Sequence, residues 1–304
     1  SDLEVCMQGG IHPSYTGNTY LNIVRAVKRA APDIHVHAFT PLEVMHGART
    51  LGMPVRDFLA RLIDAGLNSL PGTAAEILDD DVRQVICPDK VNTQEWLDVM
   101  RTAHGLGLRS TATIMFGHVE QPLYWARHLL RIRTLQEETG GFTEFIPLPF
   151  VHMGAPVYQR GQARKGPTSR EAILMHAVAR LVLHPVIQNV QVSWVKLGEA
   201  GVTACLNAGA NDVGGTLMNE SISRAAGTQH GQESAPAAMD ALSQGTNTVV
   251  MLHSLNQPPG EPCAFCQPEQ TTGHRFAPQE MKRKVPGSKP VPERTVHRHW
   301  SRLI

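Results

Sequence analysis

The 304-residue sequence has few features of membrane, secreted or nucleic-acid-binding proteins. No stretch approaches the roughly 20 apolar residues that a membrane-spanning helix needs, and residues 1–10 do not resemble a signal peptide. Only 18% of the residues are charged and the net charge is +1, so no electrostatic footprint for nucleic acid or anionic membrane stands out. We therefore expect a cytoplasmic protein that acts on small molecules.

Cysteine is also scarce, which argues against a disulfide-stapled secreted fold and favours a reducing compartment. The five cysteines are Cys6, Cys87, Cys205, Cys263 and Cys266. The closely spaced pair Cys263 and Cys266 supplies only two ligands, so we expect no metal site there. The sequence has no Cys-x₃-Cys-x₂-Cys motif, no phosphate-binding P-loop and no nucleophile elbow. No residue of this sequence is therefore assigned as a metal ligand.

Short apolar runs alternate with longer amphipathic stretches up to about residue 227. The strand candidates are 3–7, 34–39, 67–70, 110–116, 143–148, 189–195 and 212–217, and helical patterns occupy 19–30, 55–65, 93–106, 123–139 and 169–183. This alternation predicts parallel βα units, most economically a (β/α)₈ TIM-type barrel. Because only seven strands can be identified, we expect the missing unit to lie upstream of Ser1, leaving the barrel incomplete at its N-terminus.

The composition changes near His230, beyond which proline is frequent and the strand–helix rhythm ends. Only a helix at 235–243 and an apolar run at 248–252 are predicted there. We therefore divide the chain into a partial barrel, residues 1–230, and a Pro-rich, largely irregular C-terminal tail, residues 231–304.

Alternation along the strands predicts which side chains enter the barrel lumen. In 34–39 the apolar set should face the helices, so His37 and Phe39 point inward. The same rule places Thr111, Thr113, Met115, Gln191 and Ser193 in the lumen. A lumen that is polar at several levels is expected of a substrate cavity.

Several motifs fall where strands end at the mouth of the barrel. Gln8-Gly9-Gly10 lets a backbone approach a ligand, or forms a plain turn. His118 and Glu120 can exchange protons or bind polar groups, or are structural. Thr73 and Glu76 read as a helical capping box that is compatible with ligand binding. Asp212 lies at the start of the last predicted strand, which is followed by glycines. This segment either binds phosphate or makes only surface contacts.

Taken together, these strings resemble the radical S-adenosylmethionine (SAM) family that contains FO synthase and the futalosine-pathway menaquinone enzymes. The matching strings are EVCMQGGIHP at 4–13, HVHAF at 35–39, PGTAAEIL at 71–78, MFGHVE at 115–120, GGFTEFIPLPF at 140–150, SWVKLG at 193–198 and NAGAND at 207–212. The later strings are similar to the tyrosine-using, CofH-type half of FO synthase, which is the C-terminal half of the fused FbiC protein.

The resemblance implies a transferase that joins the tyrosine-derived 4-hydroxybenzyl group to 5-amino-6-(D-ribitylamino)uracil in deazaflavin coenzyme biosynthesis. It also implies SAM, a [4Fe–4S] cluster whose ligands are not in this chain, and a CofG-like half enzyme, fused or separate. The SAM candidates are Gln8, Gly9, Gly10, Glu76, Thr113, Met115 and Gly117. The catalytic candidates are His118 and Glu120, and the substrate candidates are His37, Phe39, Gln191, Ser193 and Asp212.

The missing cluster motif leaves other interpretations open, because a [4Fe–4S] cluster without three thiolates has no site. One is an aminofutalosine synthase-like radical SAM enzyme of menaquinone biosynthesis. Another is an inactive fragment or pseudogene product. On any of these interpretations the isolated chain is expected to be inert.

Overall fold

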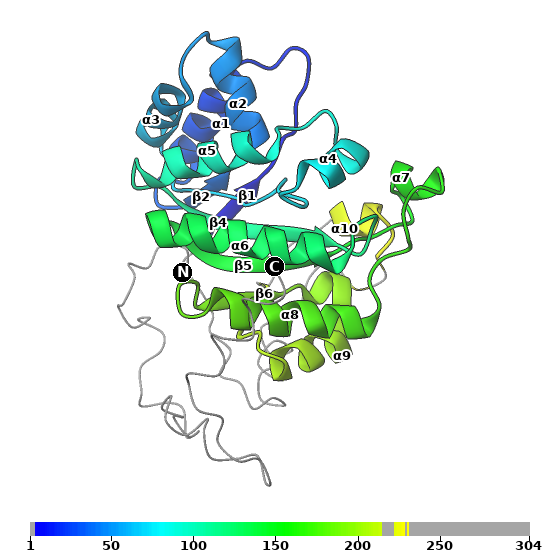
Figure 1. Cartoon of the computed structure of the whole chain (residues 1–304). Helices are drawn as coiled ribbons and strands as arrows, with labels where there is room; N and C mark the ends of the chain where they lie inside the picture. Colours follow the sequence, from blue (N-terminus) through cyan, green and yellow to red (C-terminus); the bar gives the residue numbers. More distant parts are fainter. Residues whose placement is uncertain (1–3, 215–221, 229, 231–304) are drawn as a thin grey trace, which may run out of the picture. The chain divides into compact units, whose positions relative to one another are not determined.

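The computed structural model describes residues 4–214, 222–228 and 230, all within one compact unit of the chain, residues 1–256. Seven parallel strands pair in the order β1-β2-β3-β4-β5-β6-β7 (Figure 1). They are β1 (Glu4–Met7), β2 (His35–Ala38), β3 (Ser69–Leu70), β4 (Arg109–Phe116), β5 (Phe142–Pro149), β6 (Asn189–Val192) and β7 (Asp212–Val213). Because each strand pairs with the next along the chain, the sheet is an incomplete (β/α)₈ barrel, as the alternation predicted.

Helices follow the strands in the same rhythm (Figure 1). They are α1 (Gly17–Ala30), α2 (Pro41–Thr50), α3 (Val55–Ala65), α4 (Asp80–Ile86), α5 (Thr93–His104), α6 (Pro122–Thr139), α7 (Pro156–Gln159), α8 (Ser169–Leu183), α9 (Trp194–Asn207) and α10 (Ile222–Ala225). Capping boxes begin α2, α5 and α8, each with a glutamate three residues after the cap. These local signals explain where the helices start.

The apolar face of the sheet packs on the helices in separate clusters. One joins strands β4–β6 to α5, α6 and α8, and its rings include Trp96 stacked on Phe142 at 6.2 Å. Ala112, Ile114 and Phe116 of β4 are fully buried there, so the predicted outward set of this strand is confirmed. The alternate residues of β4 are thereby left for the lumen.

The predicted orientation of Phe39 is wrong. This residue has a left-handed backbone, φ +68°, which turns its side chain out of the strand alternation. Its ring lies 5.0 Å from that of Tyr20, within the cluster formed by β2 and helices α1–α3. The substrate role given to Phe39 assumed an inward ring, and this geometry removes that support.

The predicted capping box at Thr73 and Glu76 is also wrong, because no helix starts there. Helix α4 begins only at Asp80, with Asp79 as its cap, and residues 71–79 form a turn instead. Strand β6 stops at Val192, and Trp194 already begins α9. The elements predicted at 235–243 and 248–252, and with them the division at residue 230, lie outside the described residues.

None of the helices within the described ranges is both long enough and apolar enough to cross a membrane.

Candidate functional site

The Gly-Gly turn after β1 is held by a buried glutamate of α2. Oε1 of Glu43 accepts the backbone N–H of Gly9 at 2.7 Å, while Oε2 accepts the N–H and hydroxyl of Thr40 at 2.8 and 2.9 Å. Gly10 has φ +65°, and a Cβ added there would meet nothing within 4 Å. The turn is therefore fixed on one side and open on the other, where its backbone can approach a ligand. Glu43 was missed, although its Thr-Pro-Leu-Glu capping box is visible in the sequence.

The turn after β3 places Glu76 at the end of β4. Its carbonyl accepts the N–H of Met115 at 2.8 Å, and its Oε1 pairs with Nζ of Lys90 at 2.5 Å. Glu76 is one of the two non-glycine residues in the described part of the chain with positive φ, here +48°. A strained backbone of this kind persists only where surrounding contacts hold it, and it often marks a functional site.

Two threonines of β4 continue the pairing with β3 through their side chains. The hydroxyl of Thr111 accepts the N–H of Gly72 at 2.8 Å, and the hydroxyl of Thr113 donates to the Gly72 carbonyl at 2.9 Å. A Cβ on Gly72 would lie 2.5 Å from the Thr111 carbonyl oxygen, so glycine is required. The hydroxyl proton of Thr113 is therefore already used within the protein.

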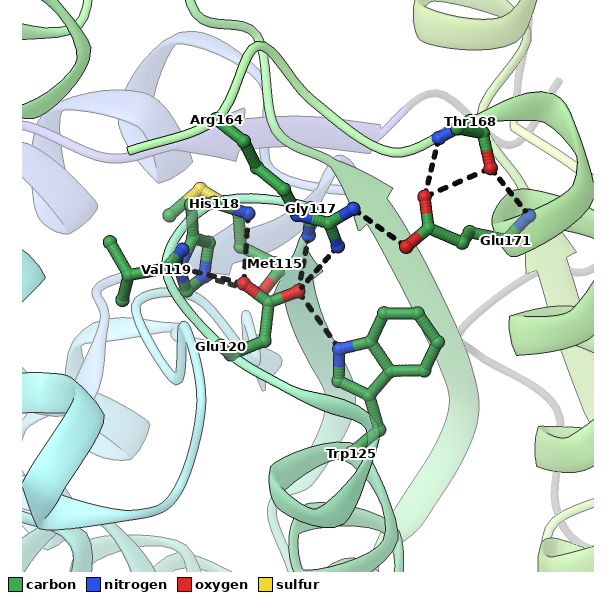
Figure 2. Close-up of polar contacts among 9 residues, drawn as sticks. All are labelled: Met115, Gly117, His118, Val119, Glu120, Trp125, Arg164, Thr168 and Glu171. Atoms are coloured by element: carbon green, nitrogen blue, oxygen red, sulfur yellow. Dashed lines mark hydrogen bonds and ion pairs between the residues drawn. The ribbon is translucent and has the colours of Figure 1, made fainter. Parts of the chain in front are cut away.

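His118 and Glu120 form a buried cluster in the turn after β4 (Figure 2). Oε1 of Glu120 accepts from the Gly117 N–H at 2.5 Å and from Trp125 Nε1 at 2.9 Å, and Oε2 accepts from the His118 N–H at 2.8 Å. Burial acts to raise the pKa of Glu120, but the contacts with His118, Gly117 and Trp125 outweigh it and lower that pKa to about 2. Glu120 is thus a carboxylate at neutral pH, and its side chain has no solvent exposure.

The lumen holds a group of acidic side chains that we name the acid cluster: Glu4, Glu144 and Asp212, with Gln191 between the last two. Nε2 of Gln191 donates to Oε2 of Glu144 at 2.8 Å and lies 3.5 Å from Oδ2 of Asp212. The side-chain amide of Gln191 thus lies between the two carboxyl groups. The structure therefore brings together Gln191 and Asp212, which the sequence had placed on different strands of one lumen.

Burial, followed by the neighbouring Asp212, raises the pKa of Glu144 well above its usual range. Burial raises the pKa of Asp212 to about 6. Glu4 is exposed on the edge strand, yet partial burial of its carboxyl and then the nearby Glu144 raise its pKa to about 7. The cluster can therefore hold and exchange protons near neutral pH. Glu144 was missed, yet alternation about the outward Phe145 would have placed it in the lumen.

His37 lies in a buried histidine–serine group between β2 and β3. Its Nδ1 is 2.7 Å from Oγ of Ser69, and Nε2 of His35 is also 2.7 Å from that oxygen. One hydroxyl cannot donate to both rings, so it donates to one and accepts from the other. Burial, then the neighbouring His35, lowers the pKa of His37 to about 3, which keeps its ring neutral. Ser193, another predicted lumen residue, lies at the start of α9 as its cap.

The described residues do not fit an iron–sulfur cluster. Three cysteines lie among them: Cys6 is on the edge strand β1, Cys87 follows α4, and Cys205 packs in the apolar cluster of α9. In these ranges no three histidine, cysteine or acidic side chains come together in a group that could hold a metal ion. A [4Fe–4S] cluster needs three or four thiolates at one point.

Comparison with known proteins decides the family. A family model described as the Radical SAM superfamily matches residues 1–130, and one described as the CofH/MqnC C-terminal region matches residues 139–246. A curated 5-amino-6-(D-ribitylamino)uracil–L-tyrosine 4-hydroxyphenyl transferase of Methanopyrus kandleri is 48% identical over 256 residues, which cover 84% of this chain and 69% of the relative. The chain belongs to this CofH-type radical SAM family.

Other relatives are much longer proteins. The FO synthases of Streptomyces avermitilis and Nocardia farcinica are 54% and 53% identical, over 75% and 80% of this chain. The matched regions cover 27% and 28% of those two proteins, so this chain spans about a quarter of their length. The crystal structure of methylornithine synthase (PylB) aligns with a TM-score of 0.49 at 19% identity, covering 73% of this chain and 56% of that one.

Proposed function

We propose that this barrel serves a radical SAM transferase that joins the 4-hydroxybenzyl group of L-tyrosine to 5-amino-6-(D-ribitylamino)uracil. The observation that carries the proposal is the 48% identity to the Methanopyrus kandleri transferase across most of both chains. The longer FO synthases fit the same proposal, in which a CofG-like half, fused or separate, takes the product.

SAM is assigned to the mouth formed by β1, β3 and β4. The open backbone of Gly10, held through Gly9 and Glu43, suits the amino-acid end of the cofactor. The remaining candidates for contact with SAM are Gln8, Glu76, Thr113, Met115 and Gly117. When bound, SAM supplies the group that abstracts hydrogen from tyrosine, and these residues orient it. Because the described residues do not fit a [4Fe–4S] cluster, the proposed activity takes its cluster from residues outside them.

Substrate is assigned to the polar lumen, where Gln191, Asp212 and His37 lie. The acid cluster offers more hydrogen-bond acceptors than donors, which suits the N–H and O–H groups of a ribityl uracil and the ammonium group of tyrosine. Because their pKa values are raised, the carboxyls of Glu144 and Asp212 can hold protons for the transfer steps that build the adduct. The proton-exchange role predicted for His118 and Glu120 stays a prediction, and so does the contact predicted for Ser193.

The test is to supply a cluster-binding βα unit from the Methanopyrus kandleri relative, reconstitute the cluster, and add reductant, SAM, tyrosine and the ribityl uracil. Mass spectrometry should show 5′-deoxyadenosine and the coupled adduct, both dependent on tyrosine. A loaded cluster without SAM cleavage would contradict the proposal and leave an inactive chain. SAM cleavage that ignores tyrosine would instead favour the menaquinone-type alternative.

A further inference from the structure

The connection between β5 and α8 makes a long excursion at the mouth, which we name the mouth loop, residues 151–163. It contains the short helix α7, and none of its side chains is buried. A segment without buried side chains has little packing energy of its own, so its position depends on contacts at its ends and tip.

Both ends of the mouth loop are fixed to the same turn, the one that follows β4. On the incoming side the N–H of Phe150 donates to the Phe116 carbonyl at 2.8 Å. On the outgoing side the N–H of Arg164 donates to the His118 carbonyl at 3.1 Å, and the rings of His118 and Phe150 lie 5.7 Å apart. The loop therefore starts and ends at residues 116–118.

The tip of the loop contacts a segment far along the chain. The N–H of Gly154 donates to the Ala226 carbonyl at 3.2 Å, and Gly227 packs so closely on Met153 that an added Cβ would come within 2.8 Å of its side chain. The mouth loop thus connects the ends of β4 and β5 with the turn after α10, beyond β7.

Glu120 holds the turn on which both ends of the loop depend. Figure 2 shows its carboxylate enclosed by Gly117, His118, Trp125 and Arg164. Beyond the three hydrogen bonds given above, Oε1 lies 3.5 Å from Nη2 of Arg164. Nδ1 of His118 lies 2.9 Å from Oε2, but this nitrogen accepts the Val119 N–H at 2.8 Å. Every oxygen of Glu120 therefore faces protein donors, and none faces solvent.

Arg164 extends this hold to the next helix. Its Nη1 donates to Oε1 of Glu171 at 2.6 Å, and the other oxygen of Glu171 closes the capping box with Thr168 (Figure 2). One guanidinium thus links a buried carboxylate of the β4 turn to the start of α8, with the outgoing end of the loop between them.

We propose that Glu120 is a positioning residue: with Arg164 it holds both ends of the mouth loop on the β4 turn and so sets where the loop tip rests on residues 226–227. This role explains why a charged side chain is completely buried at the mouth and why all its acceptors are used internally. Proton exchange was the role predicted for His118 and Glu120. The proposal gives Glu120 a structural role, which is to set the position of the mouth loop.

The test is hydrogen exchange on the full chain, without cofactor or substrate, so its outcome is independent of the proposed activity. The amides of Gly154, Gln162 and Arg164 donate to carbonyls and report the loop. Since a hydrogen bond to a charged group is worth about a tenfold change in an equilibrium, Glu120→Gln should speed exchange of these amides roughly tenfold. Exchange in α6 and α8 should change much less.

Variants of Arg164 test whether the positive charge of this residue holds the loop. Arg164→Gln should speed loop exchange to a similar degree, while Arg164→Lys, which keeps a positive charge near Glu120, should restore most of the protection. The matched control Glu171→Gln keeps the Glu120–Arg164 contact and should leave the loop protected. Because Arg164 is part-exposed, its variants decide the question even if Glu120→Gln does not fold.

Three results would overturn the proposal: unchanged loop exchange in Glu120→Gln and Arg164→Gln, an equal effect of Glu171→Gln, or a uniform rise across α6 and α8. The last would show that Glu120 supports the whole fold and not the loop. No difference between the lysine and glutamine variants of Arg164 would likewise exclude a role for charge.

Discussion

Gln191 donates from Nε2 to Oε2 of Glu144 at 2.8 Å and so joins strands β6 and β5 within the acid cluster. The raised pKa values of Asp212, about 6, and Glu4, about 7, mean that folding favours the protonated forms. This stabilisation is complete below their ordinary values and is lost as the pH rises through the folded ones. Because of the acid cluster, the free energy of unfolding should therefore fall as the pH rises from about 4 to about 7.

We expect Glu144→Gln to flatten this part of the stability profile, because it removes a buried carboxyl that folding favours in its protonated form. The free energy of unfolding in urea should be measured from pH 4.5 to 7.5 for both proteins, and the variant should gain on the order of 2 kcal/mol relative to wild type across that window. The comparison must be between variants, since buried histidines act in the opposite sense. Parallel profiles would show that folding does not raise the pKa of Glu144.

His128 is one such histidine, fully buried, with its Nδ1 accepting the N–H of Leu78 at 3.0 Å. Burial, then Arg131 and Arg83, lowers its pKa to about 3, so its contribution to stability is present above its ordinary pKa and is lost as the pH falls. We expect its ring to stay neutral at pH 5, as nitrogen chemical shifts in NMR can show.

Replacing His128 tests the same contact by stability. His128→Phe leaves the Leu78 N–H unsatisfied and should cost about 1–3 kcal/mol at pH 7, while His128→Gln retains an acceptor and should cost less. Equal losses in the two variants would contradict a role for the hydrogen bond.

Gly117 and Gly107 form a matched pair with similar backbones but different surroundings. Their φ angles are +96° and +83°, yet a Cβ on Gly117 would lie 2.3 Å from Pro167, while one on Gly107 would meet nothing within 4 Å. Gly107→Ala should cost about 1 kcal/mol from strain alone, and Gly117→Ala several times more from strain and overlap. Thermal unfolding of both variants measures this, and equal shifts in Tm would contradict the close packing at Pro167.

Glu43 and Glu95 occupy the same position in two capping boxes, but only Glu43 also holds the Gly9 N–H. Each alanine variant should lose about 1 kcal/mol of stability from its cap. Glu43→Ala should in addition weaken SAM binding about tenfold, because the Gly-Gly turn loses its support. Equilibrium dialysis with labelled SAM gives the affinities. If both variants bind SAM equally well, Glu43 does not support the site.

The helices and strands were largely readable from the sequence because their signals are local. Apolar spacing predicted all seven strands, and the bounds of α3 and α8 agree with the structure to the residue. Helix α2 was overlooked, although Thr40 and Glu43 of its capping box are plain in the sequence. The same local strings predicted the family, and relatives are about half identical to this chain over the matched regions.

The sequence by itself determined the barrel class and the set of polar side chains that its strands carry, since both depend on periods of two and 3.6 residues along one segment. Only the tertiary structure decided which of these polar side chains contact one another. Gln191 reaches Glu144 because β5 and β6 pair in one register, and Phe39 leaves the lumen because its φ is positive. Strand register and a single backbone angle are set by the packing of the whole barrel, so no local pattern could reveal them.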